Sequence, residues 1–102
     1  AAEETLGKLV KVDTGNAQAF TALGWAQLER GRTAEAEGNL KRALVLEPKN
    51  AQANNNLGVL YLRTGRATDA ERRFREALAA DPSFASAQEN LELVESGKKG
   101  KR

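Results

Sequence analysis

The sequence contains no cysteine and no histidine, and it has only two prolines, one tryptophan and one tyrosine. Without cysteine no disulfide can form, and without either residue the usual zinc-ligand sets and most nucleophile–base pairs are excluded. The acidic residues follow the spacing of exposed helix faces rather than that of paired catalytic carboxylates. We therefore expect a protein that is not an enzyme, binds no cofactor or metal and has no small-molecule substrate.

Long apolar stretches are missing as well. The longest apolar runs fall far short of the length that a membrane span requires, and no signal peptide is visible. We therefore expect no membrane association. With 102 residues, the chain has room for one domain with a modest core.

Positive charge is concentrated at one end of the chain. The net charge is +2, but Lys98, Lys99, Lys101 and Arg102 place four positive charges in the last five residues. The rest of the chain is slightly acidic, which is not the pattern of a nucleic-acid-binding surface. We interpret residues 97–102 as a basic disordered tail and do not expect nucleic acid to be a partner.

The sequence repeats itself with a period of 34 residues. When residues 17–50 are aligned with 51–84, thirteen positions are identical, against about two to four expected by chance in a chain so rich in alanine and leucine. The identical pairs include Leu23/Leu57, Gly24/Gly58, Leu28/Leu62, Gly31/Gly65, Ala36/Ala70, Ala43/Ala77, Leu44/Leu78 and Pro48/Pro82. A third, partial copy starts at Ala85, with Asn90 and Leu91 at the positions of Asn56 and Leu57.

Each unit reads as a pair of helices. Small and apolar residues recur every three or four positions, which is typical of amphipathic helices. The pattern predicts helices near 1–13, 17–30, 33–46, 51–64, 67–80 and 85–96. Residues that end or cap helices stand at these boundaries: Gly31, Gly65, Pro48 and Pro82 as stops, and Asn16, Asn50, Thr33 and Thr68 as N-caps.

These residues carry a resemblance to a known family. The second unit, with Leu57-Gly58, Tyr61, Gly65, Ala70, Phe74, Ala77 and Pro82, resembles the tetratricopeptide repeat. The first unit resembles it through Phe20, Leu23-Gly24, Gly31, Ala36, Leu40, Ala43 and Pro48, and the two units depart from it at Gln27 and Asn54. The resemblance implies an all-α fold, a right-handed α-solenoid of antiparallel helix pairs. The domain would span 1–96, with a partial repeat at 1–16, repeats at 17–50 and 51–84, and a C-terminal capping helix at 85–96.

The same resemblance implies a groove lined by the first helix of each unit. Asn56 and Asn90 stand one period apart and resemble the asparagine ladder that holds peptide backbone in O-linked N-acetylglucosamine transferases. The other candidate peptide-binding residues are Asn55, Trp25, Gln52, Val59, Leu62 and Arg63. For Asn56 the alternative is a repeat-to-repeat hydrogen bond or solvation, and for Trp25 it is core packing. Asn54 falls at a packing position, where we expect a loosened core site rather than a ligand contact.

A second type of groove in this family, a carboxylate clamp for acidic C-terminal tails, is not expected. Its basic residues would fall at Thr21, Ser86 and Asn90, none of which is Lys or Arg. The sequence thus favours an interaction module or scaffold that binds an extended peptide or a helix of a partner protein.

The alternative function is structural, with self-association or stacking inside a longer array. Ala2, Leu6 and Leu9 would form an apolar edge in the first predicted helix, whereas Glu89, Glu92 and Glu95 give the last helix a polar outer face. Such an edge predicts either further repeats upstream or a weak homodimer. Since the chain begins with Ala1 rather than methionine, we expect it to be a piece of a longer protein.

Overall fold

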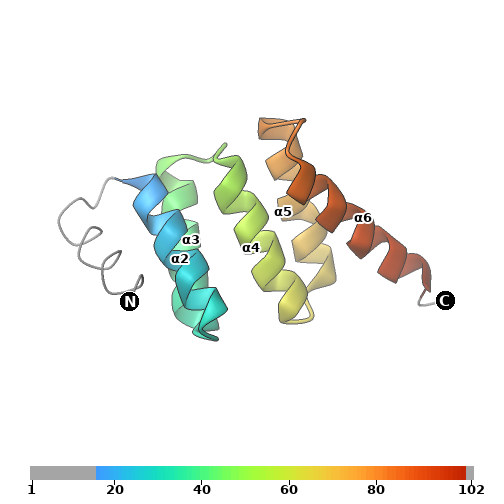
Figure 1. Ribbon diagram of the computed structural model, residues 1–102, viewed down its shortest axis with the longest axis horizontal. Coiled ribbons are helices and arrows are strands. Elements are labelled where there is room, and N and C mark those ends of the chain that lie inside the picture. The colour runs from blue at the N-terminus through green and yellow to red at the C-terminus, as the bar shows by residue number, and fades with distance from the viewer. Residues whose placement is uncertain (1–15, 101–102) are drawn as a thin grey trace.

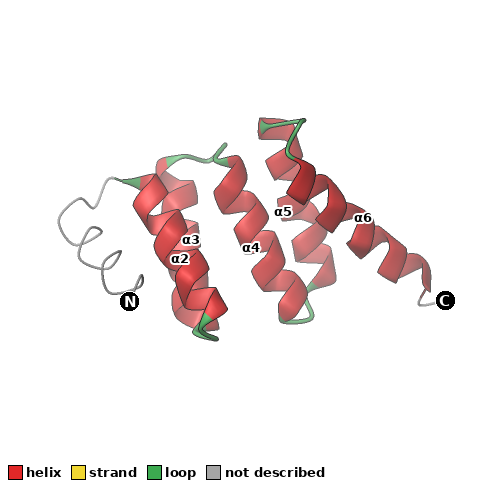
Figure 2. Cartoon of the chain, viewed as in Figure 1, coloured by secondary structure: helices red, strands yellow, loops and turns green. Residues whose placement is uncertain are grey.

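The computed structural model describes residues 16–100, and these residues form helices without strands. The helices are α2 (Ala17–Glu29), α3 (Thr33–Leu46), α4 (Ala51–Arg63), α5 (Ala67–Ala80) and α6 (Ala85–Gly100). Helices α2 and α3 pack as one pair and α4 and α5 as the next, while α6 packs on α5 (Figures 1 and 2). In Figure 1, α2, α4 and α6 form the nearer layer, with α3 and α5 behind them. The predicted all-α repeat array is confirmed.

The helix boundaries follow from local chemistry. The side chains of Asn16 and Asn50 accept hydrogen bonds from the backbone N–H groups of Ala19 (3.0 Å) and Ala53 (2.9 Å), so both predicted N-caps are confirmed. Gly31 and Gly65 have φ of +81° and +79°, the left-handed conformation that ends α2 and α4.

Two boundary predictions differ from the structure. Thr33 and Thr68 do not cap the second helices, because the N-cap positions are taken by Arg32 and Arg66, neither of which makes a side-chain capping bond. Helix α6 also continues to Gly100, four residues past the end predicted for the last helix. The predicted helix 1–13 and its apolar edge of Ala2, Leu6 and Leu9 lie outside the described residues, so self-association through that edge stays a prediction.

Close contact between paired helices depends on two glycines. A Cβ atom built on Gly58 would lie 2.6 Å from Cδ1 of Phe74, and one on Gly24 would lie 2.7 Å from Cγ of Leu40. Phe74 and Leu40 are fully buried, so neither side chain can move aside freely. The glycines of the two repeated Leu-Gly pairs are therefore needed for close packing of the helices.

Asn54 is not the loosened site that the sequence suggested. Its side chain is fully buried and makes three hydrogen bonds. The amide nitrogen donates to the backbone oxygens of Pro48 (3.3 Å) and Asn50 (3.2 Å), and the amide oxygen accepts from Arg73 on α5 (3.0 Å). Asn54 thus ties the loop before α4 to the following helix, which explains a polar residue in the core.

Charged side chains on α5 form ion pairs along the helix and with α6. Arg72 and Arg73 lie 3.8 Å and 3.2 Å from carboxylate oxygens of Glu76. Arg75 contacts Glu71 at 3.4 Å and reaches Glu95 on α6 at 3.2 Å. The last of these pairs helps to hold α6 against α5.

A polar cluster centred on Glu37 joins the two repeats. The Glu37 carboxylate on α3 accepts a hydrogen bond from the hydroxyl of Tyr61 on α4 (3.1 Å) and pairs with Arg66 (3.1 Å) and Lys41 (3.0 Å). Burial by itself would raise the pKa of Glu37, but the hydrogen bonds from Lys41, Arg66 and Tyr61 together lower it. The ionised carboxylate is thus favoured in the folded state.

This cluster makes stability depend on pH. Because folding lowers the pKa of Glu37, its contribution should be present above pH 4.5 and be lost as the pH falls through the lowered pKa. Glu37→Gln should lower the free energy of unfolding by about 1–2 kcal/mol at neutral pH, with the difference disappearing in acid. Urea unfolding followed by circular dichroism across this pH range measures it. Glu92→Gln is the control, since the Glu92 residue is exposed and, among the described residues, its carboxylate accepts a hydrogen bond only from Gln88. An equal loss at all pH values for Glu37→Gln would rule out the linkage.

Candidate functional site

A hollow of about 350 Å³ lies across the helices α2, α4 and α6. Its walls are formed by the first helix of each repeat and by the terminal helix, which share one layer of the array (Figure 1). We call its lining residues the groove site: Trp25, Gln52, Asn55, Asn56, Val59, Arg63, Ser86, Glu89 and Asn90.

Most residues predicted from the sequence meet in the groove site. Leu62 does not, because its side chain is partly buried and packs against the main hydrophobic cluster. The groove site also contains Ser86 and Glu89, which are not among the binding residues predicted from the sequence.

The amide side chains of the groove site are paired with one another. Asn90 on α6 donates its amide N–H to the side-chain oxygen of Asn55 on α4 at 3.1 Å. Within α4, Gln52 donates to the side-chain oxygen of Asn56 at 2.7 Å. Asn56 and Asn90 therefore do not form two equivalent rungs, since each has a different partner.

Each of these hydrogen bonds uses one polar atom of each amide group, so the other polar atom of that group stays without a hydrogen bond to the described residues. The amide nitrogens of Asn55 and Asn56 and the amide oxygens of Gln52 and Asn90 make no hydrogen bond in the described part of the chain. Gln52 is exposed and Asn90 half-buried, whereas Asn55 and Asn56 are only 5% and 3% exposed. No buried polar side-chain atom in this part of the chain lacks a partner, so the amide nitrogens of Asn55 and Asn56 keep a small contact with solvent at the floor of the hollow. The groove site thus presents donors and acceptors whose side chains are already held in place, which is what recognition of a peptide unit requires.

Trp25 belongs to the groove site and not to the core. Its side chain is 37% exposed, and the Arg63 guanidinium lies 5.8 Å from the centre of its ring. Arg63 also pairs with Glu29 at 3.2 Å, linking α4 to α2. The aromatic face and the cation therefore form one wall of the hollow. Of the two roles that the sequence left open for Trp25, the exposed position in the groove is the one observed.

Thr21, the counterpart of Asn55 in the first repeat, is removed from the site. It does not line the hollow, and its hydroxyl donates to the backbone oxygen of Ala17 in its own helix at 2.8 Å. The polar row along the first helices therefore starts at α4 and continues onto α6.

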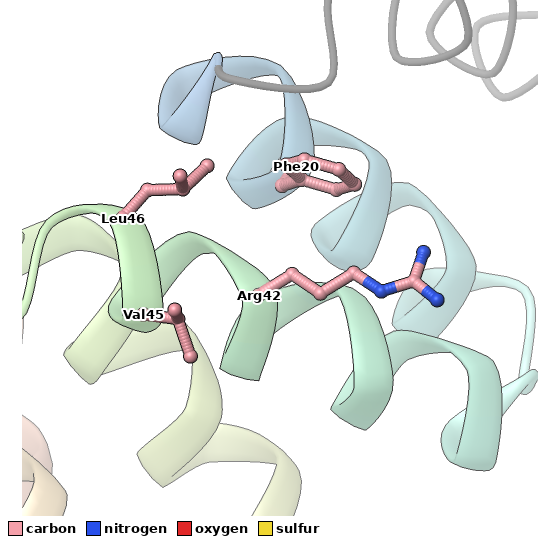
Figure 3. A pocket seen from close by; sticks show the side chains of 4 residues that line it. All are labelled: Phe20, Arg42, Val45 and Leu46. Carbon is pink, nitrogen blue, oxygen red and sulfur yellow. The ribbon is translucent and has the colours of Figure 1, made fainter.

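A second hollow, of about 360 Å³, lies between α2 and α3 and was not anticipated from the sequence. Figure 3 shows the lining residues, Phe20 from α2 and Arg42, Val45 and Leu46 from α3. Val45 is 81% exposed, and the Arg42 guanidinium lies 5.9 Å from the centre of the Phe20 ring. The next repeat carries Asn54, Glu76, Ala79 and Ala80 at these positions, so the feature is specific to the first repeat.

Neither a metal site nor a membrane span is found in the part of the chain that the structure describes. No group of three or more acidic side chains there could hold a metal ion. No helix among these residues is long and apolar enough to cross a bilayer.

The paired helices, the 34-residue register and the glycine contacts define a helical repeat protein. The sequence matches the family described as "Tetratricopeptide repeat" over residues 1–45, 21–83 and 61–91. The chain belongs to this family. No curated protein sequence shows a significant match to it.

Solved structures agree with this assignment. Two structures of MamA share 30% sequence identity with the chain and cover 95% of it, with TM-scores of 0.87 and 0.85. The chain spans 57% and 53% of the length of these two MamA chains. A Thermobaculum terrenum O-GlcNAc transferase, at 25% identity and a TM-score of 0.86, covers 90% of this chain, which spans 18% of the enzyme. The Arabidopsis OM64 TPR domain has the same fold, with a TM-score of 0.90, 23% identity and coverage of 94% of this chain and 79% of that one.

Proposed function

We propose that the chain is a non-catalytic interaction module that binds an extended peptide segment of a partner protein in the groove site. The observation that carries this proposal is the set of four amide atoms that remain unbonded beside the exposed Trp25 ring. Amide donors can bind peptide C=O groups and amide oxygens can bind peptide N–H groups, whatever the peptide's side chains. Trp25 adds an apolar surface of the kind that dominates binding energy at interfaces.

Structural neighbours support this mode of binding. The first TPR of Spaghetti (RPAP3) is bound to the HSP90 peptide SRMEEVD, and a Yersinia enterocolitica secretion chaperone, SycD, is in complex with a peptide of the translocator YopD. They share 18% and 16% sequence identity with this chain, so they support the use of the fold and not a particular ligand.

Removing one amide tests the proposal. Within the described residues the Asn56 side chain is bonded only to Gln52 in its own helix, so Asn56→Ala should lower peptide affinity by about five- to tenfold with a smaller loss of stability than Asn55→Ala. Asn55→Ala should lower affinity and also stability, because it breaks the link between α4 and α6. Peptides for the measurement come from selection of a random display library on the immobilised protein, and affinity is read by fluorescence anisotropy.

Asn39→Ala is the matched control. Asn39 lies on α3, outside the groove site, where its amide donates to Gln27 at 2.7 Å, so its loss can change stability but should leave peptide affinity unchanged. A library that yields no peptide enriched over a Trp25→Ala, Asn56→Ala double variant would contradict the proposed function. Equal losses of affinity and stability in Asn56→Ala would assign Asn56 a structural role.

A further inference from the structure

The groove site is lined by two charged side chains, and only one of them has an ionic partner in the described part of the chain. Arg63 pairs with Glu29 at 3.2 Å and stacks on Trp25. Glu89, on the opposite side of the hollow, is exposed and makes no ion pair or side-chain hydrogen bond with the described residues. The charge that remains unbalanced at this surface is therefore negative.

Glu89 lies next to the amide side chains of the groove site, which are those of Gln52, Asn55, Asn56 and Asn90. It occupies the place in α6 that Asn55 occupies in α4 and Thr21 in α2, since the three residues are spaced by the repeat period. Asn90 follows Glu89 and is held by the hydrogen bond to Asn55, so the segment of α6 that carries the carboxylate is tied to α4. A ligand that contacts these amides thus meets Trp25 on the α2 side of the hollow and the Glu89 carboxylate on the α6 side.

An acidic ligand would find no complementary group at this site. Its carboxylate would compete with Glu29 for Arg63 and would be repelled by Glu89, and like charges brought together across an interface are unfavourable. A basic side chain of a ligand could instead pair with the exposed Glu89 carboxylate, and the existing pair between Arg63 and Glu29 would stay intact.

We infer that the segment bound in the groove site carries a lysine or arginine that pairs with Glu89, together with an apolar side chain that packs on Trp25 and Val59. The inference rests on the proposed function and specifies the ligand: a basic-apolar extended segment within a partner protein, not an acidic chain terminus. Arginine fits best where its guanidinium can also use the amide oxygen of Asn90.

Selection of a random peptide library on the full chain tests the inference. Peptides enriched on the wild type should contain Lys or Arg at a preferred position, and Glu89→Lys should instead enrich peptides with Asp or Glu there. Synthetic copies with acetylated and amidated ends remove terminal charges from the comparison. For a basic peptide, Glu89→Gln should weaken binding by about two- to fivefold, the range of an exposed ion pair.

Salt provides a second readout that a purely structural role of Glu89 would not change. Affinity of the basic peptide for the wild type should fall between about 50 mM and about 500 mM NaCl, and Glu89→Gln should flatten that dependence. Glu92→Gln is the matched control, one turn along α6 and outside the groove site, and should behave as the wild type.

The outcomes separate the ligand chemistry from the proposed function. Enriched peptides that depend on Asn56 and Trp25 but show acidic residues or no charge preference would overturn the basic ligand and leave peptide binding in place. If no peptide is enriched, both the basic ligand and peptide binding in the groove site are wrong. If the chain instead forms dimers that dissociate when residues 97–102 are deleted or Glu89 is changed to glutamine, the occupant is the basic end of a second copy, and the inference of a partner protein's segment is wrong.

Discussion

Gly58→Ala should lower the free energy of unfolding by about 2–3 kcal/mol, although the change adds only a methyl group. The added methyl group would overlap the Phe74 ring, with distances of 2.6 Å to Cδ1 and 3.0 Å to Cζ. Phe74 is fully buried, so the ring can move only by displacing the rest of the core. The expected gain in helix propensity, about 1 kcal/mol, is too small to offset the overlap.

Thermal and urea unfolding measure this loss, and Gly38→Ala is the matched control. Gly38 lies in α3 without a positive φ, and a methyl group added to it would meet no atom within 4 Å, so the same substitution should stabilise the protein by about 0.5–1 kcal/mol. The pair of variants separates packing from backbone entropy because the chemistry of the change is identical.

A double-mutant cycle identifies the contact itself. Phe74→Leu removes the ring edge that the methyl group would meet, so Gly58→Ala should cost much less in the Phe74→Leu background than in the wild type. If the two substitutions are additive, or if Gly58→Ala is neutral, α4 and α5 do not approach as closely as the structure shows.

The helices could be predicted from sequence because their boundaries are set by neighbouring residues. Asn16 and Asn50 cap the helices that they precede, and Gly31 and Gly65 end them through their positive φ. These effects require no knowledge of tertiary contacts. The repeat register then placed most groove residues on one surface, because equivalent positions of stacked repeats face the same way.

The polar contacts could not be predicted in the same way, since they depend on how the helices cross. Register pairs Asn56 with Asn90, whereas the hydrogen bond joins Asn55 to Asn90, one residue out of the repeat period. Asn54 is a poor core residue by its chemistry alone, yet Arg73 and the Pro48 carbonyl lie beside it and satisfy its amide. In both cases the partner of an amide is decided by side-chain geometry between helices, which periodicity does not specify.

The polar contacts of the first repeat also could not be predicted from the repeat period. Gln27 stands where the second repeat has Tyr61, and both are buried. Gln27 accepts a hydrogen bond from Asn39 at 2.7 Å, while Tyr61 donates to Glu37 at 3.1 Å. The contact of Gln27 lies within its own repeat, between α2 and α3, whereas the contact of Tyr61 joins α4 to α3 of the preceding repeat. The departure from the family pattern at Gln27 therefore changes which helices the side chain at this position links, and the repeat period alone does not predict that change.

Trp25→Ala should reduce the affinity for a peptide selected on the wild type by about 30-fold, corresponding to about 2 kcal/mol at a buried aromatic anchor. Stability should fall by about 1 kcal/mol or less, because the side chain is 37% exposed and the main interaction lost is that with Arg63. Leu93→Ala is the control: Leu93 is the counterpart of Trp25 in α6, is 61% exposed and lies outside the groove site, so its loss should leave affinity unchanged.

The sole tryptophan also reports binding directly. Since part of the Trp25 ring faces solvent in the free protein, its emission should be accessible to a water-soluble quencher and should shift to the blue when a peptide covers it. Leu93→Ala should show the same shift at the same peptide concentrations. An affinity that survives Trp25→Ala, together with a wild-type emission that does not change on saturation, would place the peptide elsewhere on the molecule. The apolar hollow of Phe20, Val45 and Leu46 would then be the next surface to test, by Val45→Lys.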